Sequence, residues 1–263
     1  MPEAAEFAGS SLLAVFAHPD DESLACGGLL ASCAARGARV TLLCVTKGED
    51  GPGDEQAIEL RRRTRAGELE AAARVLGLSE VILLDYPDGE LKWLDPARSD
   101  RLQVDIAAAI ARTSPAVVIT FGEDGLYWHP DHIMIHELTT AAVAALGDAA
   151  PALYYVTLPP GAIRTIVDTV ERDVPDGRAH RLVFGIDDPD AFGAFAAPPT
   201  LVVDAGPFAA RKLEALRCHR SQLRDEALAV VPEATALRVL GTEHFHRASV
   251  GATGDTFLEG LAT

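Results

Sequence analysis

The chain has 263 residues, of which 39 are acidic and 23 are basic, and its formal net charge is −16. Hydrophobic residues make up 48% of the chain and charged residues 24%, which excludes an intrinsically disordered protein and predicts a substantial core in one large domain or two small ones. The acidic balance excludes nucleic acid and anionic membrane surfaces as partners, and no apolar stretch is long enough to span a bilayer.

The N-terminus and the cysteines indicate a cytoplasmic protein. Residues 1–10 contain no basic side chain, so we expect no export signal there. Cys26, Cys33, Cys44 and Cys218 form no CxxC pair, which favours buried, reduced thiols over disulfides or a cysteine metal site. The sequence leaves open whether the chain forms a homo-oligomer.

Strand-like and helix-like segments alternate along the chain. Apolar and β-branched runs typical of buried strands occur at 12–17, 39–46, 81–84, 116–121, 153–158 and 201–203. Helical periodicity occurs at 23–36, 54–76, 98–112, 131–146 and 207–222. This alternation predicts an α/β fold, a Rossmann-like three-layer sandwich in which helices cover both faces of a mostly parallel sheet.

We expect a single domain over residues 1–263, with the Rossmann-like core in 1–160. Residues 161–263 then form a substrate-covering segment and the C-terminal elements. From 161 to 205, prolines and acidic residues interrupt any long periodicity, so we expect an irregular C-terminal third.

Histidines and aspartates gather after two of the predicted inner strands, where ligands bind in open parallel sheets. After the first and fourth strands come two groups of three: His18, Asp20 and Asp21, then His129, Asp131 and His132. Two imidazoles and a carboxylate hold Zn²⁺ or Fe²⁺ while leaving positions open for water and substrate. A proline follows each leading histidine and restricts its backbone. The pattern predicts a catalytic metal site.

Helix capping is the competing explanation for these aspartates. Asp is a favoured N-cap residue, and its charge complements the helix dipole. For one Asp taken alone, capping is the better explanation. Capping does not explain two His-Pro-Asp segments, each at the end of an inner strand and each with another potential ligand just beyond it. We therefore favour the metal site.

The sequence Ala-His-Pro-Asp-Asp-Glu at 17–22 and the sequence His-Pro-Asp-His at 129–132 resemble the two signature motifs of a known family. This family is the PIG-L/LmbE-like N-acetylglucosaminyl deacetylases, which include mycothiol and bacillithiol biosynthetic deacetylases and mycothiol conjugate amidases. Further matches occur at 26–28, 46–49, 86–89 and 219–222. The likeness spans residues from about 11 to 222, and only the segment 161–205 looks variable.

The resemblance implies that His18, Asp21 and His132 bind a catalytic Zn²⁺, with Fe²⁺ as the alternative in the cell. It also implies that Asp20 is the general base and that His129 faces the developing oxyanion. This division of labour is physically sound, because a metal acidifies its bound water and an adjacent unliganded carboxylate can take the proton.

Two more residues of the second motif region are assigned catalytic roles. We expect Asp131 to accept a hydrogen bond from the imidazole of His129 and to favour its protonated form, which would donate to the tetrahedral oxygen. By the resemblance, Tyr127 assists at the carbonyl oxygen. A loop aromatic more often packs over a pocket, and this is our interpretation of Trp128.

Glu49, Arg65 and Asp88 are the predicted substrate contacts. By the resemblance they fall where relatives contact sugar hydroxyls, and carboxylates with a guanidinium suit polyol recognition. For Arg65 the commoner explanation is ion pairing on a solvated helix face, because it lies in an arginine-rich run on an acid-rich helix.

The remaining histidines and the glycine pair receive structural interpretations. We assign His136 to the surroundings of the site or to the core. His244 and His246 flank Phe245 in a segment that resembles a terminal strand, and their role stays open. Gly27 and Gly28 favour close packing of a helix over phosphate binding, because no GxGxxG spacing surrounds them.

The leading hypothesis is a metal-dependent hydrolase that deacetylates a small N-acetylglucosaminyl substrate, such as GlcNAc-malate, GlcNAc-inositol or a related glycoside. One alternative is an amidase that acts on a larger thiol conjugate. An Fe²⁺ oxygenase uses a similar ligand set but needs no adjacent base. A nucleotide-binding domain without metal is disfavoured, because the glycine-rich turn is missing.

Overall fold

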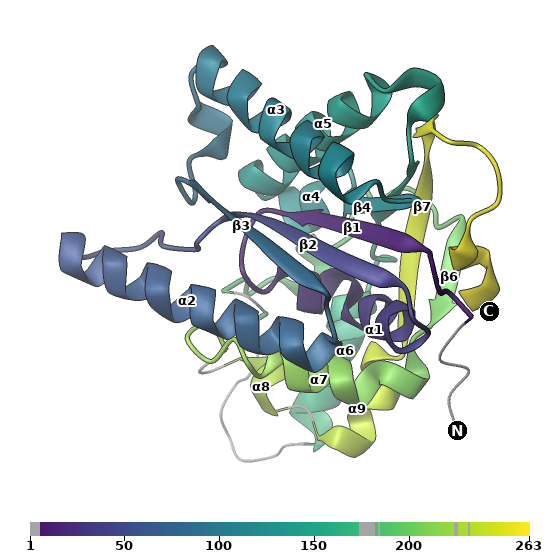
Figure 1. Ribbon diagram of the computed structural model, residues 1–263. Coiled ribbons are helices and arrows are strands. Elements are labelled where there is room, and N and C mark those ends of the chain that lie inside the picture. The colour runs from purple at the N-terminus through teal and green to yellow at the C-terminus, as the bar shows by residue number, and fades with distance from the viewer. Residues whose placement is uncertain (1–5, 174–181, 184, 224–225, 231) are drawn as a thin grey trace.

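A computed structural model describes residues 6–173, 182–183, 185–223, 226–230 and 232–263 (Figure 1). Within these ranges, seven strands form one sheet in the order β3-β2-β1-β4-β5-β7-β6. Their bounds are β1 Ser11–Phe16, β2 Arg39–Thr46, β3 Glu80–Tyr86, β4 Val117–Phe121, β5 Ala152–Val156, β6 Leu201–Asp204 and β7 Thr242–Gly251. Residues 174–181 and 184 of the predicted irregular segment lie outside the described residues.

Strands β1 to β5 are parallel, as predicted. Their order, 3-2-1-4-5, is that of Rossmann-type sheets. Every residue of β1 and β4 is buried, which follows from their continuous apolar sequence and from the helices on both sides. The predicted Rossmann-like three-layer sandwich is therefore confirmed.

Helices cover both faces of the sheet (Figure 1). The helices α1 (Asp21–Ala35), α2 (Glu55–Leu76) and α7 (Ala209–Leu216) pack against one another on one face. On the other face, α3 (Pro96–Thr113) packs against α5 (Pro130–Ala144). The shorter or later helices are α4 Gly125–Trp128, α6 Ala162–Asp173, α8 Ala227–Val230 and α9 Glu233–Leu240. None of the helices in the described ranges is long and apolar enough to cross a membrane.

The C-terminal third differs in part from the sequence prediction. Helix α6 lies in the segment 161–205, where we expected no long periodicity. Its apolar residues recur every three or four positions and pack into a second apolar cluster. Strand β7 inserts antiparallel between β5 and β6, so the predicted terminal strand is confirmed. The predicted helix 207–222 is shorter than expected and ends at Leu216. The division of the chain at residue 160 stays a prediction.

Helix α1 is kinked at Cys26, and a buried carboxylate supports the part of the helix beyond the kink. Glu243 of β7 accepts hydrogen bonds from the backbone N–H of Gly28, at 2.8 Å, and of the next residue, at 2.7 Å. Lys212 of α7 pairs with the same carboxylate at 2.6 Å. A Cβ on Gly28 would lie 2.5 Å from the Cβ of Ala205, so this glycine permits close packing, as predicted.

Candidate active site

The carboxyl ends of β1 and β4 lie side by side, because these two strands are paired neighbours in the sheet. The chain leaves β1 toward β2 and returns to β4 on the other side, which makes this edge a topological switch point where ligands bind in such folds. A cavity of about 270 Å³ opens here. Its lining is His18, Asp20, Asp21, Leu24, Asp50, Arg65, Asp88, Gly89, Leu126, Tyr127, His129 and Gln222.

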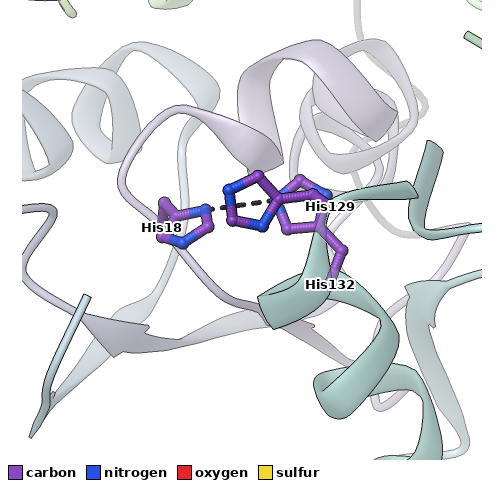
Figure 2. A group of neighbouring side chains, drawn as sticks. All are labelled: His18, His129 and His132. Carbon is purple, nitrogen blue, oxygen red and sulfur yellow. Dashed lines mark hydrogen bonds between the residues drawn. The ribbon is translucent and has the colours of Figure 1, made fainter. Parts of the chain in front are cut away.

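His18, Asp21 and His132 converge beside this cavity. Figure 2 shows the imidazoles of His18 and His132 gathered with that of His129, and its dashed line marks the contact between His18 and His132. His18 Nδ1 lies 3.1 Å from His132 Nε2. The two carboxylate oxygens of Asp21 lie 3.4 Å from His18 Nδ1 and 3.2 Å from His132 Nε2. Ligand atoms about 2.0–2.1 Å from a tetrahedral Zn²⁺ are themselves about 3.3 Å apart, so the three donors have the spacing of one metal shell.

The outward-facing nitrogens of both rings are engaged with oxygen atoms, which fixes the tautomers. His132 Nδ1 donates to the carbonyl oxygen of Gly125 at 3.1 Å. His18 Nε2 lies 3.0 Å from a carboxylate oxygen of Asp88 and 3.3 Å from one of Asp131. When both rings are neutral, His18 Nδ1 and His132 Nε2 carry the lone pairs that face the Asp21 carboxylate. Three electron-pair donors at this spacing suit a cation shared between them.

The electrostatics of the site favour positive charge. Burial lowers the pKa of His18, but its hydrogen bonds to Asp131, Asp21 and Asp88 outweigh burial and hold that pKa well above its usual value. Burial raises the pKa of Asp21, but His132 and His18 hold it well below the usual range. His18 lowers the pKa of Asp88 to about 2 despite burial.

Asp131 contacts a different histidine from the one we predicted. Its carboxylate accepts the N–H groups of Gly89, at 2.8 Å, and Leu91, at 3.0 Å, and it contacts His18 Nε2 instead of the His129 ring. Both oxygens are therefore committed to neighbouring groups, and neither caps helix α5. A carboxylate behind a metal-ligating histidine fixes the ring and its tautomer.

His129 is the N-cap residue of α5, where its Nδ1 accepts the backbone N–H of Asp131 at 3.2 Å. Burial, followed by the neighbouring His132 and His18, lowers the pKa of His129 to about 4. The expectation of a protonated His129 is therefore not met, because the Asp131 carboxylate that we expected behind its ring contacts His18 Nε2 and two backbone N–H groups instead. A neutral imidazole whose Nδ1 is an acceptor still carries a proton on Nε2 and can donate from that atom.

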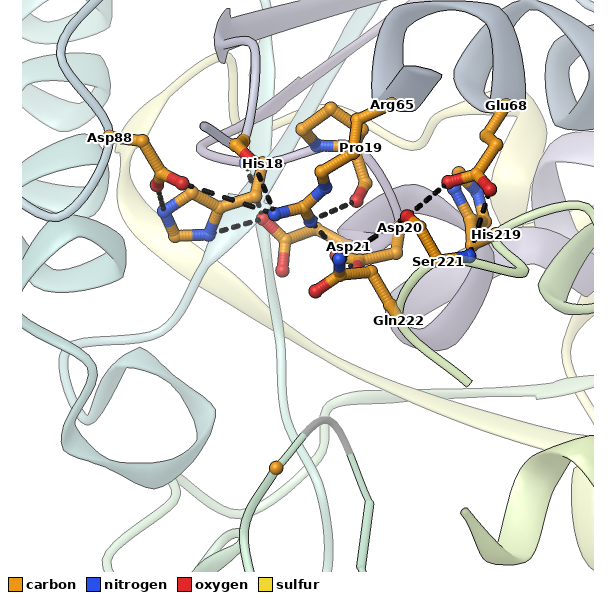
Figure 3. Close-up of polar contacts among 12 residues, drawn as sticks. His18, Pro19, Asp20, Asp21, Arg65, Glu68, Asp88, His219, Ser221 and Gln222 are labelled. Carbon is orange, nitrogen blue, oxygen red and sulfur yellow. Dashed lines mark hydrogen bonds and ion pairs between the residues drawn. The ribbon is translucent and has the colours of Figure 1, made fainter. Parts of the chain in front are cut away.

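Asp20 adjoins Asp21 but has different partners (Figure 3). Arg65 of α2 donates to Asp20 Oδ2 at 3.0 Å and to the carbonyl oxygens of Pro19 and Gly48. Burial raises the pKa of Asp20 to about 7, and Arg65 limits the rise. Asp20 precedes α1, yet its side chain makes no capping hydrogen bond. The solvated-face explanation for Arg65 is wrong, because only 10% of its side chain is exposed.

Of the other residues considered for the site, Tyr127 lines the cavity, whereas Trp128 and Glu49 do not. Tyr127 lines the cavity, and burial raises the pKa of its hydroxyl. Trp128 is 52% exposed and packs edge-on against Phe195, at 5.6 Å between ring centroids. Glu49 does not line the cavity, and its carboxylate lies 3.4 Å from the guanidinium of Arg62. Its role in substrate binding stays a prediction.

The remaining histidines fall outside the cavity lining. His136 Nδ1 donates to the carbonyl oxygen of Phe121, at 3.0 Å. His246 Nδ1 donates to the carbonyl oxygen of Pro198, at 2.7 Å, and His244 lines a separate groove.

Sequence reasoning missed a buried pair formed by Glu22 and His219, whose Nε2 lies 3.0 Å from Glu22 Oε1. Burial lowers the pKa of His219, but the Glu22 carboxylate outweighs burial and raises it. Glu22 lies in the family-like motif at 17–22 and His219 in the one at 219–222. Their place in these motifs was the signal in the sequence that could have pointed to a shared role.

Comparison with known proteins places the chain in a family. Residues 13–143 match the family model PIG-L, described as GlcNAc-PI de-N-acetylase. The chain is 34% identical to a 1D-myo-inositol 2-acetamido-2-deoxy-α-D-glucopyranoside deacetylase from Mycolicibacterium gilvum, over 96% of this chain and 95% of that protein. The chain belongs to the PIG-L family. It is thus a member of a family of de-N-acetylases, and the predicted resemblance is confirmed.

Solved structures share the fold of this PIG-L family member. The N,N'-diacetylchitobiose deacetylase from Pyrococcus horikoshii matches with a TM-score of 0.60 and 23% identity, over 91% of this chain and 84% of that one. GalB, the 4-carboxy-2-hydroxymuconate hydratase from Pseudomonas putida, matches with a TM-score of 0.62 and 20% identity, over 94% and 99%. At this identity the likeness shows the fold alone, and the second match shows that this fold also serves a different reaction.

Proposed function

We propose that this PIG-L family member is a metal-dependent hydrolase that removes the acetyl group from an N-acetylglucosaminyl substrate, releasing acetate and a free amine. The observation that carries the proposal is the convergence of His18 Nδ1, His132 Nε2 and the Asp21 carboxylate, 3.1 to 3.4 Å apart, beside the separately held carboxylate of Asp20.

His18, Asp21 and His132 would hold a divalent ion, with Zn²⁺ proposed and Fe²⁺ as the alternative. Two neutral imidazoles and one carboxylate suit either ion and leave positions open. When bound, such an ion supplies a Lewis acid that acidifies water and polarises the acetyl carbonyl. Behind His18, Asp88 and Asp131 hold the ring and its tautomer.

Asp20 is the proposed general base. It is buried, it is not one of the proposed ligands, and Arg65 holds one of its oxygens. Its pKa of about 7 lies near neutral pH, where a carboxylate is both available as a base and able to return the proton. The proton that Asp20 takes from the attacking water then passes to the departing amine.

His129 and Tyr127 are the proposed donors to the tetrahedral oxygen. The two rings meet edge-on, with centroids 5.7 Å apart, and both line the cavity. His129 acts here through Nε2–H as a neutral imidazole. A fixed donor of this kind stabilises developing charge without reorganisation at the moment of reaction.

The proposed substrate is a GlcNAc-inositol type glycoside, after the activity named for the relative from Mycolicibacterium gilvum. GlcNAc-malate and larger thiol conjugates are the alternatives. Arg65 and Asp88 line the cavity, but Arg65 binds Asp20 and Asp88 binds His18. We propose that both side chains support the catalytic groups, and that only their atoms outside these contacts are free to bind a sugar.

The test combines metal analysis with a substrate panel. The purified protein is analysed for bound metal, then assayed for primary amine release from GlcNAc-inositol, GlcNAc-malate, free N-acetylglucosamine and a thiol conjugate amide. We expect about one ion per chain and amine release from at least one glycoside. A chelator should abolish the activity, and added Zn²⁺ should restore it.

Three results would contradict the proposal: full activity after chelation, no metal at any added concentration, or no amine from any glycoside. Release from the thiol conjugate alone would replace the deacetylase with an amidase. His136→Ala serves as the matched control for ligand substitutions, because His136 lies one turn from His132 on α5 and outside the cavity lining.

A further inference from the structure

The segment 219–222 has no part in the proposed reaction, although its first residue is one of the most deeply buried histidines described. His219 is 0% exposed and bonds Glu22, which is also 0% exposed. Among the described residues, His219 Nδ1 has no hydrogen-bond partner. Replacing a buried ion pair by apolar side chains is often neutral or stabilising, so stability alone is a weak reason for this pair.

Glu22 connects His219 to the proposed base. One oxygen of Glu22 faces His219 and also accepts the hydroxyl of Ser23 at 2.5 Å, and the other accepts the backbone N–H of Asp20 at 3.1 Å. That backbone is unusual, since Asp20 has φ 120° and ψ −27°. A non-glycine residue in such a conformation is strained and persists only where its surroundings hold it. The Glu22 carboxylate is one of these holding contacts.

Helix α2 holds the same turn from the other side (Figure 3). Its Arg65 bonds the Asp20 carboxylate and the carbonyl oxygen of Pro19. Three residues further along the helix, Glu68 accepts two hydrogen bonds from Ser221, one from the backbone N–H at 2.8 Å and one from the hydroxyl at 2.6 Å. The contacts form a closed ring around Asp20 that runs through α1, the segment 219–222 and α2.

We propose that His219 is a positioning residue for Asp20 and acts through Glu22. It fixes the Glu22 carboxylate, which holds the strained backbone of Asp20, so that Asp21 faces the metal ligands while Asp20 faces the cavity and Arg65. This inference rests on the proposed function, in which Asp20 is the general base. Without His219, the oxygen of Glu22 that faces it keeps only the hydroxyl of its neighbour Ser23, so the carboxylate is held less firmly. The strained backbone of Asp20 then relaxes, and the base leaves its reactive position.

Two amide substitutions separate this role from simple packing. His219→Gln places an N–H near the position of Nε2 and keeps the bond to Glu22, whereas the shorter His219→Asn reaches only the position of Nδ1. We expect His219→Asn to lower kcat about 10- to 100-fold, because a displacement of 1 Å can cost about 10²-fold, with KM and metal content nearly unchanged. His219→Gln should recover most of that loss. The exposed neighbour Arg220 supplies the control, Arg220→Ala, which should match the wild type.

A double-mutant cycle tests whether His219 acts through Asp20. In the background of Asp20→Asn, His219→Asn should reduce the residual rate by less than about threefold, because the base that it positions is already gone. Equal losses in both backgrounds, or equal kcat for the Asn and Gln variants at 219, would overturn the inference while leaving the proposed function intact. Wild-type activity of Asp20→Asn would instead refute the base assignment and this inference with it. Circular dichroism checks that each variant is folded. Ser221→Ala, a change at an exposed position, should lower kcat about threefold without altering the fold.

Discussion

Asp131→Asn is the substitution that most directly tests the outer contacts of the proposed metal site. It preserves the shape of the side chain but removes the charge that faces His18 Nε2 at 3.3 Å. We expect weaker metal binding, since carboxylates behind metal-bound histidines orient the ring and raise its basicity. If Asp131 instead served His129, metal affinity would stay the same and only turnover would fall.

The contacts of Asp131 indicate how far Asp131→Asn should lower metal affinity and stability. Loss of such an outer partner typically costs 10- to 100-fold in metal affinity, or about 1.4 to 2.7 kcal/mol. Asp88 still contacts the same nitrogen at 3.0 Å after the change, so we expect the lower end, about tenfold. The new amide also turns its NH₂ toward one of the two N–H groups that Asp131 accepts. One buried donor then loses its partner, and the free energy of unfolding should fall by about 1–3 kcal/mol.

Metal affinity is measured by competition with a chelator of known strength, and stability by urea unfolding of the metal-free protein. Glu137→Gln is the matched control, because Glu137 is an exposed acid on the same helix. His129→Ala is the comparison variant and should keep its metal affinity. The assignment of Asp131 to His18 is refuted if Asp131→Asn binds metal within about twofold of the wild type while losing turnover as His129→Ala does.

Three further predictions concern the base, the ligands and the packing of α1. Asp20→Asn should retain metal and lose about 10²- to 10⁴-fold in kcat; a loss below about tenfold in steady-state assays would remove Asp20 from the role of base. His132→Ala should lower metal content in elemental analysis after dialysis, whereas His136→Ala should not, and equal occupancy in the two variants would exclude His132 as a ligand. Gly28→Ala should destabilise the fold by about 1–3 kcal/mol in thermal unfolding, because its Cβ would meet another Cβ at 2.5 Å. Gly67→Ala, whose Cβ would meet nothing within 4 Å, should instead be neutral or stabilise by up to about 1 kcal/mol; similar losses for both glycines would contradict this packing argument.

The core of the fold and the gathering of the site followed from local sequence signals. Continuous apolar runs predicted the parallel strands, and the rule that ligands bind at the carboxyl ends of such strands predicted that His18 and His132 lie close together. These signals are short-range. Each depends on a strand and the loop that follows it.

What the sequence could not give were contacts between distant side chains. Arg65 sits in an arginine-rich run that is typical of a solvated face, and only the docking of α2 beside the turn after β1 buries it. The partner of Asp131 was mispredicted because nearness in sequence favoured His129, while the fold brings His18 to the carboxylate across 113 residues. The pair of Glu22 and His219 is separated by 197 residues and shows no local pattern.

Helix α6 shows a different limit of the sequence. Its apolar spacing is regular, but prolines and acidic residues follow it in the same segment and obscured the pattern. Strand β7 was recognisable as a strand, whereas its antiparallel insertion between β5 and β6 depends on which sheet edge remains open after the parallel strands have paired.

The hydrogen bonds that Glu243 accepts from α1 can form only late in the synthesis of the chain. Gly28 and the carboxylate that binds its N–H are 215 residues apart, so a ribosome must add most of the chain before α1 acquires this contact. At about 5–20 residues per second, this delay is roughly ten to forty seconds. A nascent chain therefore carries α1 without this support for nearly the whole of its synthesis, and the site proposed beside this helix should be complete only after β7 has left the exit tunnel.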